Sequence, residues 1–256
     1  MLFTLSLLFI CIQAVVSFHR VCYLTIDHRP FEFTDQENGF QGDLCTHVNV
    51  MPVSVDGEGS VFPRKPDDVQ KYAKVQELRL LNPDIKLLIT LIVTPGTVFS
   101  DAVRDVHVRK TFARNALTFI REYGFDGIDI DWEFPVFSSW RWQDKENFVS
   151  LLQEIRYLID TEAANTLLSV AVAADPTIIV PGYDAVGINS SVDYINLMSY
   201  DYTDWHWYYC LFPLPLEPLI RTFPIIQVLS SDGPQRTTLS FQFRVLLQAI
   251  EHGFFR

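Results

Sequence analysis

The sequence has little positive charge, with 20 Lys and Arg against 31 Asp and Glu and a formal net charge of −11 at pH 7. Nucleic acids and anionic membranes bind clustered Lys and Arg, so this balance argues against both as partners. It fits a neutral or cationic partner, although solubility alone would also explain it. No G-x-G-x-x-G follows a strand-like run, and the six histidines lack metal-ligand spacing. We therefore expect neither a dinucleotide cofactor nor a metal.

Long hydrophobic runs are missing except at the amino terminus. Residues 1–17 are apolar, carry no charged side chain and end in small residues, Val15 and Ser17. The run is short for a membrane span and is typical of a secretory signal peptide, which we predict over 1–17. An uncleaved anchor is the alternative. A cleaved signal implies a secreted, extracellular protein with no membrane contact afterwards.

Cysteine is scarce, with four in the chain. Cys11 would leave with the signal peptide. Cys22 and Cys45 lie in two strand-like segments and could pair in an oxidising compartment. Cys210 has no evident partner, which is unusual in a secreted chain.

Apolar runs alternate with amphipathic stretches along most of the chain, which is long enough for one large domain or two small ones. Strand-like runs cover residues 20–26, 45–53, 85–93, 167–174 and 192–200, and helical spacing covers residues 67–82, 110–123 and 143–161. Strands that are apolar on both sides and alternate with helices predict a parallel sheet covered by helices. A closed barrel and an open doubly wound sheet both fit this pattern.

The stretch Gly124 to Pro135, GFDGIDIDWEFP, is unusually acidic for a buried strand. Alternate side chains of a strand share one face at intervals of roughly 7 Å, which groups Asp129, Asp131 and Glu133. The intervening residues, Ile128, Ile130 and Trp132, face an apolar layer. Buried carboxyls are unfavourable unless they are paired, protonated or functional. A salt-bridged or metal-binding row is the alternative to a catalytic one.

Within that stretch DGIDIDWE, Asp126 to Glu133, resembles the DGxDxDWE signature of glycoside hydrolase family 18, the chitinases and chitinase-like lectins. RVCYLT and DLCTHVNV resemble the first two strands of the family and its cysteine pair, which implies a Cys22–Cys45 disulfide. INLMSYD, Ile195 to Asp201, resembles the sixth strand. The resemblance covers roughly residues 20–201 and implies a (β/α)8 TIM-type barrel over 18–204, with strands one to six recognisable.

The resemblance also implies a reaction, cleavage of β-1,4-linked N-acetylglucosamine polymers with retention and with assistance from the substrate. Glu133 resembles the general acid. Asp131 would orient the acetamido group, and Asp129 would share a proton with Asp131. The substrate-binding residues implied by the motifs are Tyr23, Phe134, Met198, Tyr200 and Asp201. The resemblance also implies that the protein is a monomer, binds chitin or its oligosaccharides and needs no cofactor.

Three departures from the family pattern affect this expectation. Leu88 to Val93 reads LITLIV, where the family usually has S-x-G-G, and Phe134 replaces the common Tyr. After Asp204 the pattern stops, and residues 205–256 are interrupted by prolines, with no recognisable seventh or eighth strand. A non-catalytic lectin and an inactive truncated fragment are therefore the alternatives to an enzyme. The presence of Glu133 favours the enzyme over the lectin.

Overall fold

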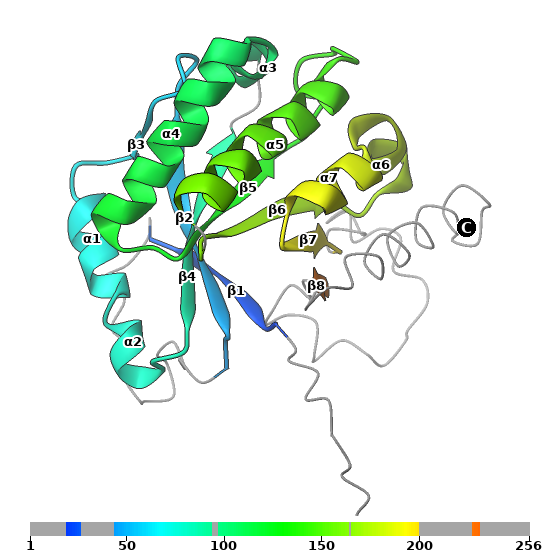
Figure 1. The fold of residues 1–256 in the computed structure, drawn as a ribbon. Coiled ribbons are helices and arrows are strands. Elements are labelled where there is room, and N and C mark those ends of the chain that lie inside the picture. The colour runs from blue at the N-terminus through cyan, green and yellow to red at the C-terminus, as the bar shows by residue number, and fades with distance from the viewer. Residues whose placement is uncertain (1–18, 27–43, 94–96, 164, 200–226, 231–256) are drawn as a thin grey trace, which may run out of the picture.

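The computed structural model describes residues 19–26, 44–93, 97–163, 165–199 and 227–230 (Figure 1). Strands in one curled sheet are covered on the outside by helices. The parallel strands are β1 Val21–Thr25, β2 His47–Val55, β4 Lys86–Val93, β5 Gly127–Trp132, β6 Leu167–Ala173 and β7 Tyr194–Met198. The helices are α1 Asp68–Val75, α2 Leu78–Leu81, α3 Thr97–Arg104, α4 Val106–Tyr123, α5 Asp144–Glu162, α6 Pro176–Gly182 and α7 Ala185–Ser191. Within these residues no helix is long and apolar enough to cross a membrane.

The parallel strands are hydrogen-bonded in chain order, β1-β2-β4-β5-β6-β7. A doubly wound sheet reverses its strand order, so that alternative is excluded. The sheet is also strongly curled, because the rings of His47 on β2 and Tyr194 on β7 lie 5.3 Å apart. In a flat sheet four strand spacings would separate them by about 19 Å. The strands therefore form the first six of a barrel, as the sequence predicts.

The outer face of the sheet forms the hydrophobic core with the helices. The apolar side of β5, Ile128, Ile130 and Trp132, is fully buried there, as expected. The Trp132 ring meets Phe99 of α3 and Phe148 of α5 edge to face, with centroids 5.0 and 5.5 Å away. Such pairs add to the burial of apolar area. This packing fixes the orientation of β5 and so directs its alternate residues into the barrel.

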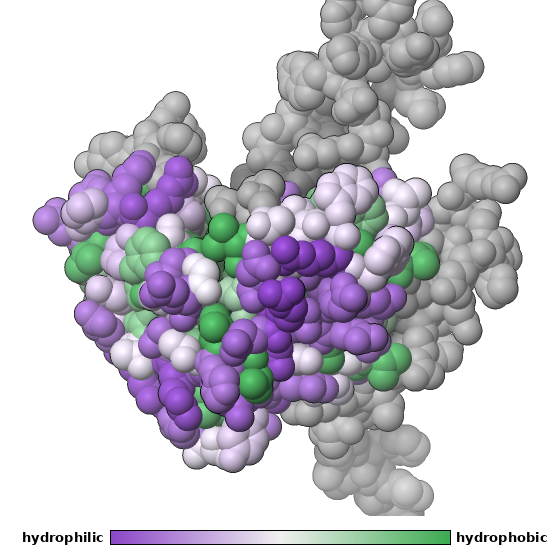
Figure 2. Space-filling model, turned by 90° about the horizontal axis from the view of Figure 1, so that it is seen from above, coloured by the Kyte–Doolittle hydropathy of each residue, from purple (hydrophilic) through white to green (hydrophobic). Residues whose placement is uncertain are grey.

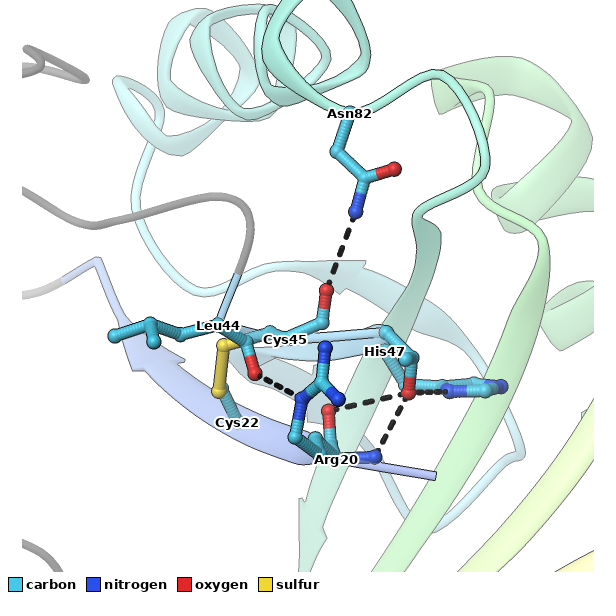
Figure 3. Close-up of a disulfide and its surroundings, with 7 residues drawn as sticks. Arg20, Cys22, Leu44, Cys45, His47 and Asn82 are labelled. Atoms are coloured by element: carbon cyan, nitrogen blue, oxygen red, sulfur yellow. Dashed lines mark hydrogen bonds between the residues drawn. A yellow bond between two sulfur atoms is a disulfide. The ribbon is translucent and has the colours of Figure 1, made fainter. Parts of the chain in front are cut away.

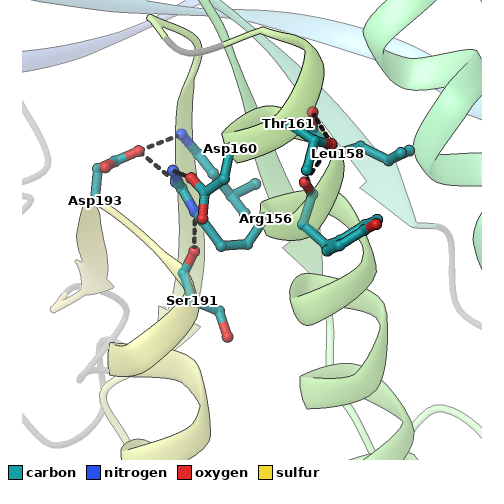
Figure 4. Close-up of polar contacts among 8 residues, drawn as sticks. Arg156, Leu158, Asp160, Thr161, Ser191 and Asp193 are labelled. Carbon is teal, nitrogen blue, oxygen red and sulfur yellow. Dashed lines mark hydrogen bonds and ion pairs between the residues drawn. The ribbon is translucent and has the colours of Figure 1, made fainter.

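Two aspartates placed just before strands anchor helices to the sheet. Asp126, before β5, accepts from the amide of the second residue of β4 at 2.7 Å and from Arg79 of α2 at 2.9 Å. Asp193, before β7, accepts from the second residue of β6 and from Arg156 of α5, both at 2.7 Å (Figure 4). The first acid of DGIDIDWE is therefore structural.

A disulfide joins Cys22 of β1 to Cys45, just before β2, with the Cα atoms 6.0 Å apart (Figure 3). The predicted pairing is confirmed. Arg20 donates to the Leu44 carbonyl at 2.7 Å, and Asn82 donates to the Cys45 carbonyl at 3.3 Å. These contacts hold the start of β2 against its neighbours. Cys11 and Cys210 lie outside the described residues.

Several elements differ from the sequence-based expectations. Helix α4 begins at Val106 instead of Lys110, because the Asp105 side chain accepts from two amides of its first turn. Such an N-cap satisfies amides that have no partner within the helix. The helix expected over 67–82 divides into α1 and α2. The short helices α3, α6 and α7 and the strand β3, Val61–Pro63, were not predicted, although α3 has apolar residues at helical spacing, Phe99, Ala102 and Val103.

The segment after residue 204 contains one described strand, β8 Gln227–Ser230, where the sequence predicts none. It pairs antiparallel with β7, so it is not a seventh parallel strand of the barrel. An edge strand has a row of unpaired backbone groups that any extended segment can satisfy. This pairing requires backbone groups alone, which explains why a side-chain pattern does not reveal it.

Candidate active site

Strand β5 carries the acidic row into the interior of the curled sheet. Asp129 and Asp131 are 0 % and 6 % exposed. Glu133 differs from the expectation of a wholly buried row, because it follows the last residue of β5 and is exposed. The row therefore runs from the barrel interior to its rim. A Cβ at Gly127 would lie 2.5 Å from the Leu167 carbonyl oxygen, so only glycine permits this close approach of β5 to β6.

Four hydrogen-bond donors surround the Asp129 carboxylate. Oδ1 accepts from Ser169 at 2.6 Å and from Asn196 at 3.1 Å. Oδ2 accepts from Tyr23 at 2.9 Å and from Thr90 at 3.1 Å. Burial raises the pKa of Asp129, and these four hydrogen bonds oppose the rise. A carboxyl group that accepts at both oxygens fits the ionised form, which is acceptor only.

Asp131 has a contrasting environment. Its Oδ1 is buried and makes no hydrogen bond within the described part of the chain. Burial raises the pKa of Asp131 to about 8, and the negative charges of Asp129 and Glu133 contribute to the rise. Asp131 is therefore protonated at neutral pH. The four donors reach Asp129 and not Asp131, so they stabilise the negative charge on Asp129 alone.

The expected binding residues differ in their surroundings. The Tyr23 hydroxyl is committed to Asp129, and burial, followed by the Asp129 charge, raises its pKa. Met198 ends β7 on the same face as Asn196 and is half-buried. Phe134 is half-buried and packs against the hydrophobic core. Tyr200 and Asp201 lie outside the described residues.

The polar partners of Asp129 were not predicted from the sequence. Thr90 on β4 and Ser169 on β6 are the register partners of Asp129 on its two neighbouring strands. Asn196 lies within the INLMSYD motif. A hydroxyl residue in the middle of an apolar strand is the signal that could have identified Thr90 and Ser169, because such groups need a buried partner. Tyr183, after α6, is also close, since Asp131 and Glu133 help to raise its pKa after burial.

The wall beside Asp131 is apolar. Ile92 on β4 is the register partner of Asp131 and is half-buried, and the next residue, Val93, is buried. The branched side chain of Ile92, on the same face as Asp131, occupies the strand end at which the sequence lacks a glycine pair. Space next to the carboxyl row is therefore limited on the β4 side.

Metal binding finds no support in this arrangement. In the described ranges no three His, Cys, Asp or Glu side chains are grouped so as to hold a metal ion. Asp129 has all its acceptor positions filled by protein donors.

Together these features define, within the described residues, six strands of a parallel (β/α) barrel with an acidic site at the carboxyl end of β5, the end at which such barrels place their sites. The family model of glycosyl hydrolases family 18 matches residues 19–219. The chain belongs to glycosyl hydrolase family 18.

Individual relatives agree with this assignment. Chitotriosidase-1 of Mus musculus is 35 % identical over 191 residues, covering 71 % of this chain and 41 % of that protein. "Probable endochitinase" of Caenorhabditis elegans is 32 % identical over 205 residues, covering 73 % of this chain and 32 % of the relative. The chain thus spans less than half the length of these relatives.

Solved structures share the fold. The Group IV chitinase of Ostrinia furnacalis superposes with a TM-score of 0.61 at 30 % identity, covering 71 % of this chain and 51 % of that one. Catalytic domain 2 of the Group II chitinase from the same species, solved with an N-acetylchitooligosaccharide, has a TM-score of 0.62 at 29 % identity, covering 72 % and 50 %.

Proposed function

We propose that this chain is, or is part of, a secreted chitinase-type glycosidase that cleaves β-1,4-linked N-acetylglucosamine polymers. The observation that carries the proposal is the contrast within the row: an Asp129 held by four donors and an Asp131 whose pKa is raised to about 8. Family membership and a relative solved with an N-acetylchitooligosaccharide support the substrate class. The apolar run over residues 1–17 supports export.

The proposed mechanism uses each carboxyl differently. Glu133, exposed at the rim, protonates the glycosidic oxygen as the bond to the anomeric carbon breaks. The N-acetyl carbonyl oxygen of the same sugar attacks that carbon and forms an oxazolinium ion. Asp131 accepts from the acetamido N–H and so holds the acetamido group in position for this attack. Water then opens the ring with Glu133 as the base, so the configuration is retained.

Glu133→Gln tests the enzyme. Loss of the general acid should reduce the cleavage of soluble N-acetylglucosamine oligomers on the order of 100-fold or more. The melting temperature should not change, because Glu133 is exposed. Glu146→Gln is the matched control, since Glu146 is an exposed carboxylate in the first turn of α5. Equal activity of native protein and Glu133→Gln, or no cleavage by either, would remove the enzymatic proposal.

A non-catalytic carbohydrate-binding protein is the second candidate, and the branched side chain of Ile92 beside Asp131 favours it. It restricts the approach of a sugar ring to the carboxyls. The two candidates differ in calorimetry: binding of oligosaccharide without release of shorter products supports the second, and product release supports the first.

A further inference from the structure

Two tryptophans are strongly exposed close to the acidic row. Trp140 is 82 % exposed and Trp142 is 71 % exposed. Both lie in the β5–α5 loop, residues 133–143, the segment that begins with Glu133 and leads into α5. Figure 2 shows the molecule from above, the side on which this loop and α3 lie in Figure 1. This side has hydrophilic and near-neutral residues with scattered hydrophobic ones, not one broad hydrophobic surface.

Folding does not explain tryptophan at these positions. Neither indole gains from burial, and Trp140 has φ 60°, in the left-handed region that non-glycine residues rarely adopt. Val136, earlier in the loop, has φ 72°, which is rarer still for a β-branched residue. Strained positions of this kind persist where the surroundings hold them and are concentrated at functional sites.

Hydrogen bonds to α3, α5 and β5 fix the backbone of the loop. The buried carboxylate of Asp144 accepts from Ser100 of α3 at 2.5 Å and from Ser139 of the loop. Arg141, between the two tryptophans, donates to Asp101 of α3 at 2.6 Å. Trp132 of β5 donates from its indole to Ser138 at 3.0 Å. The two exposed rings are thus presented by a fixed backbone, so little loop entropy would be lost when a ligand binds.

The cationic side chains next to the rings in the sequence already have partners, so they give no reason to expect an anionic ligand. The Arg141 guanidinium is committed to Asp101, and the Lys145 ammonium donates to the Val180 carbonyl at 2.8 Å. Gln143, next to Trp142, is exposed and uncharged. Indole faces with a neutral polar neighbour match a pyranose ring, which has an apolar C–H face and a polar edge.

We propose that Trp140 and Trp142 form a platform that stacks on sugar rings of a neutral N-acetylglucosamine polymer, outside the acidic row. The proposal rests on the proposed function, because continuity of the loop with Glu133 identifies the occupant as a further stretch of the same polymer. The platform binds polymer and takes no part in bond cleavage. Its main contribution is therefore to adsorption on insoluble chitin.

Adsorption of the full chain to insoluble chitin particles tests the platform. Trp140→Ala and Trp142→Ala should each weaken adsorption about 2- to 10-fold, and the double variant about 10- to 100-fold. Cleavage of short soluble oligomers should stay within about twofold. Leu80→Ala is the control, since Leu80 is 83 % exposed on α2, away from the loop. Glu133→Gln should adsorb normally while losing cleavage, so failure of the enzyme and failure of the platform give different results.

Trp140→Gly separates binding from a structural role. Glycine tolerates φ 60° freely, so this variant should raise the melting temperature while it weakens adsorption. Native adsorption by the double variant would overturn the proposal, as would failure of the native chain to adsorb. A change confined to self-association in sedimentation, with adsorption unaltered, would assign the rings to a contact between two copies and also overturn it.

Discussion

Asp129 and Asp131 lie on the same face of the same strand, yet their surroundings differ in nearly every respect. Asp129 accepts four hydrogen bonds from side chains on four strands, β1, β4, β6 and β7. Asp131, two residues nearer the rim, has a buried oxygen with no hydrogen bond within the described part of the chain. Its neighbour on the adjacent strand β4 is the apolar residue Ile92. Burial raises the pKa of both.

The difference lies in how a negative charge is stabilised at each carboxyl. The donors around Asp129 stabilise its anion, and that anion helps to raise the pKa of Asp131 to about 8. Glu133, just beyond the end of the strand, is exposed, so exposure to solvent increases from Asp129 to Glu133. Pairs of titratable groups whose environments separate their pKa values are typical of acid–base sites. The predictions below alter one side of this contrast at a time.

Asp129→Ala should cause the largest loss of stability. It leaves the four donors without an acceptor in the barrel interior, and we expect a loss of about 3 kcal/mol in the free energy of unfolding. The same change removes a neighbouring charge, so the pKa of Asp131 should fall. Urea unfolding at pH 7 measures the first effect. Asp129→Asn keeps one acceptor oxygen, so its loss in the free energy of unfolding should be about half that of Asp129→Ala. Equal losses for the two variants would show that the donors do not depend on this acceptor.

Asp131→Asn should stabilise the folded protein, whereas Asp129→Ala should destabilise it. A carboxyl with a raised pKa binds more protons in the folded state, so stability present below about pH 4 is lost as the pH rises to about 8. The slope cannot exceed about 1.4 kcal/mol per pH unit. The variant, which cannot ionise, should be up to about 4 kcal/mol more stable than the native chain at pH 7 and nearly equal to it at and below pH 4. Parallel pH profiles of unfolding free energy for the two proteins would contradict a raised pKa.

Removing single donors should have the smallest effects. Ser169→Ala deletes the 2.6 Å hydrogen bond and Thr90→Val the 3.1 Å one, both to Asp129. We expect losses of about 1.5 and 1 kcal/mol in the free energy of unfolding. Thr161→Val, which removes an exposed hydroxyl from α5, should change stability by less than about 0.5 kcal/mol. Losses no larger than this control would mean that the donors are not needed to hold the carboxylate.

Much of the framework was predictable, since it depends on local patterns. The six parallel strands follow from apolar runs, the inward row follows from the alternation of Asp129 and Asp131 with apolar residues, and the Cys22–Cys45 pair follows from the family resemblance. The elements that escaped prediction, α3, α6, α7 and β8, are short or lack amphipathic periodicity. The role of Asp126 was also hidden, because its partners are a backbone amide and Arg79, both distant in the sequence.

The sequence by itself determined that Asp129 and Asp131 would share one face of a strand with Glu133 following at its end, since strand geometry has a period of two and needs no long-range information. Only the tertiary structure decided what each carboxyl does. The donors to Asp129 come from Tyr23, Thr90, Ser169 and Asn196, residues on separate strands that meet because the sheet curls. The pKa of a buried group depends on such neighbours and on its distance from water, and neither is encoded locally.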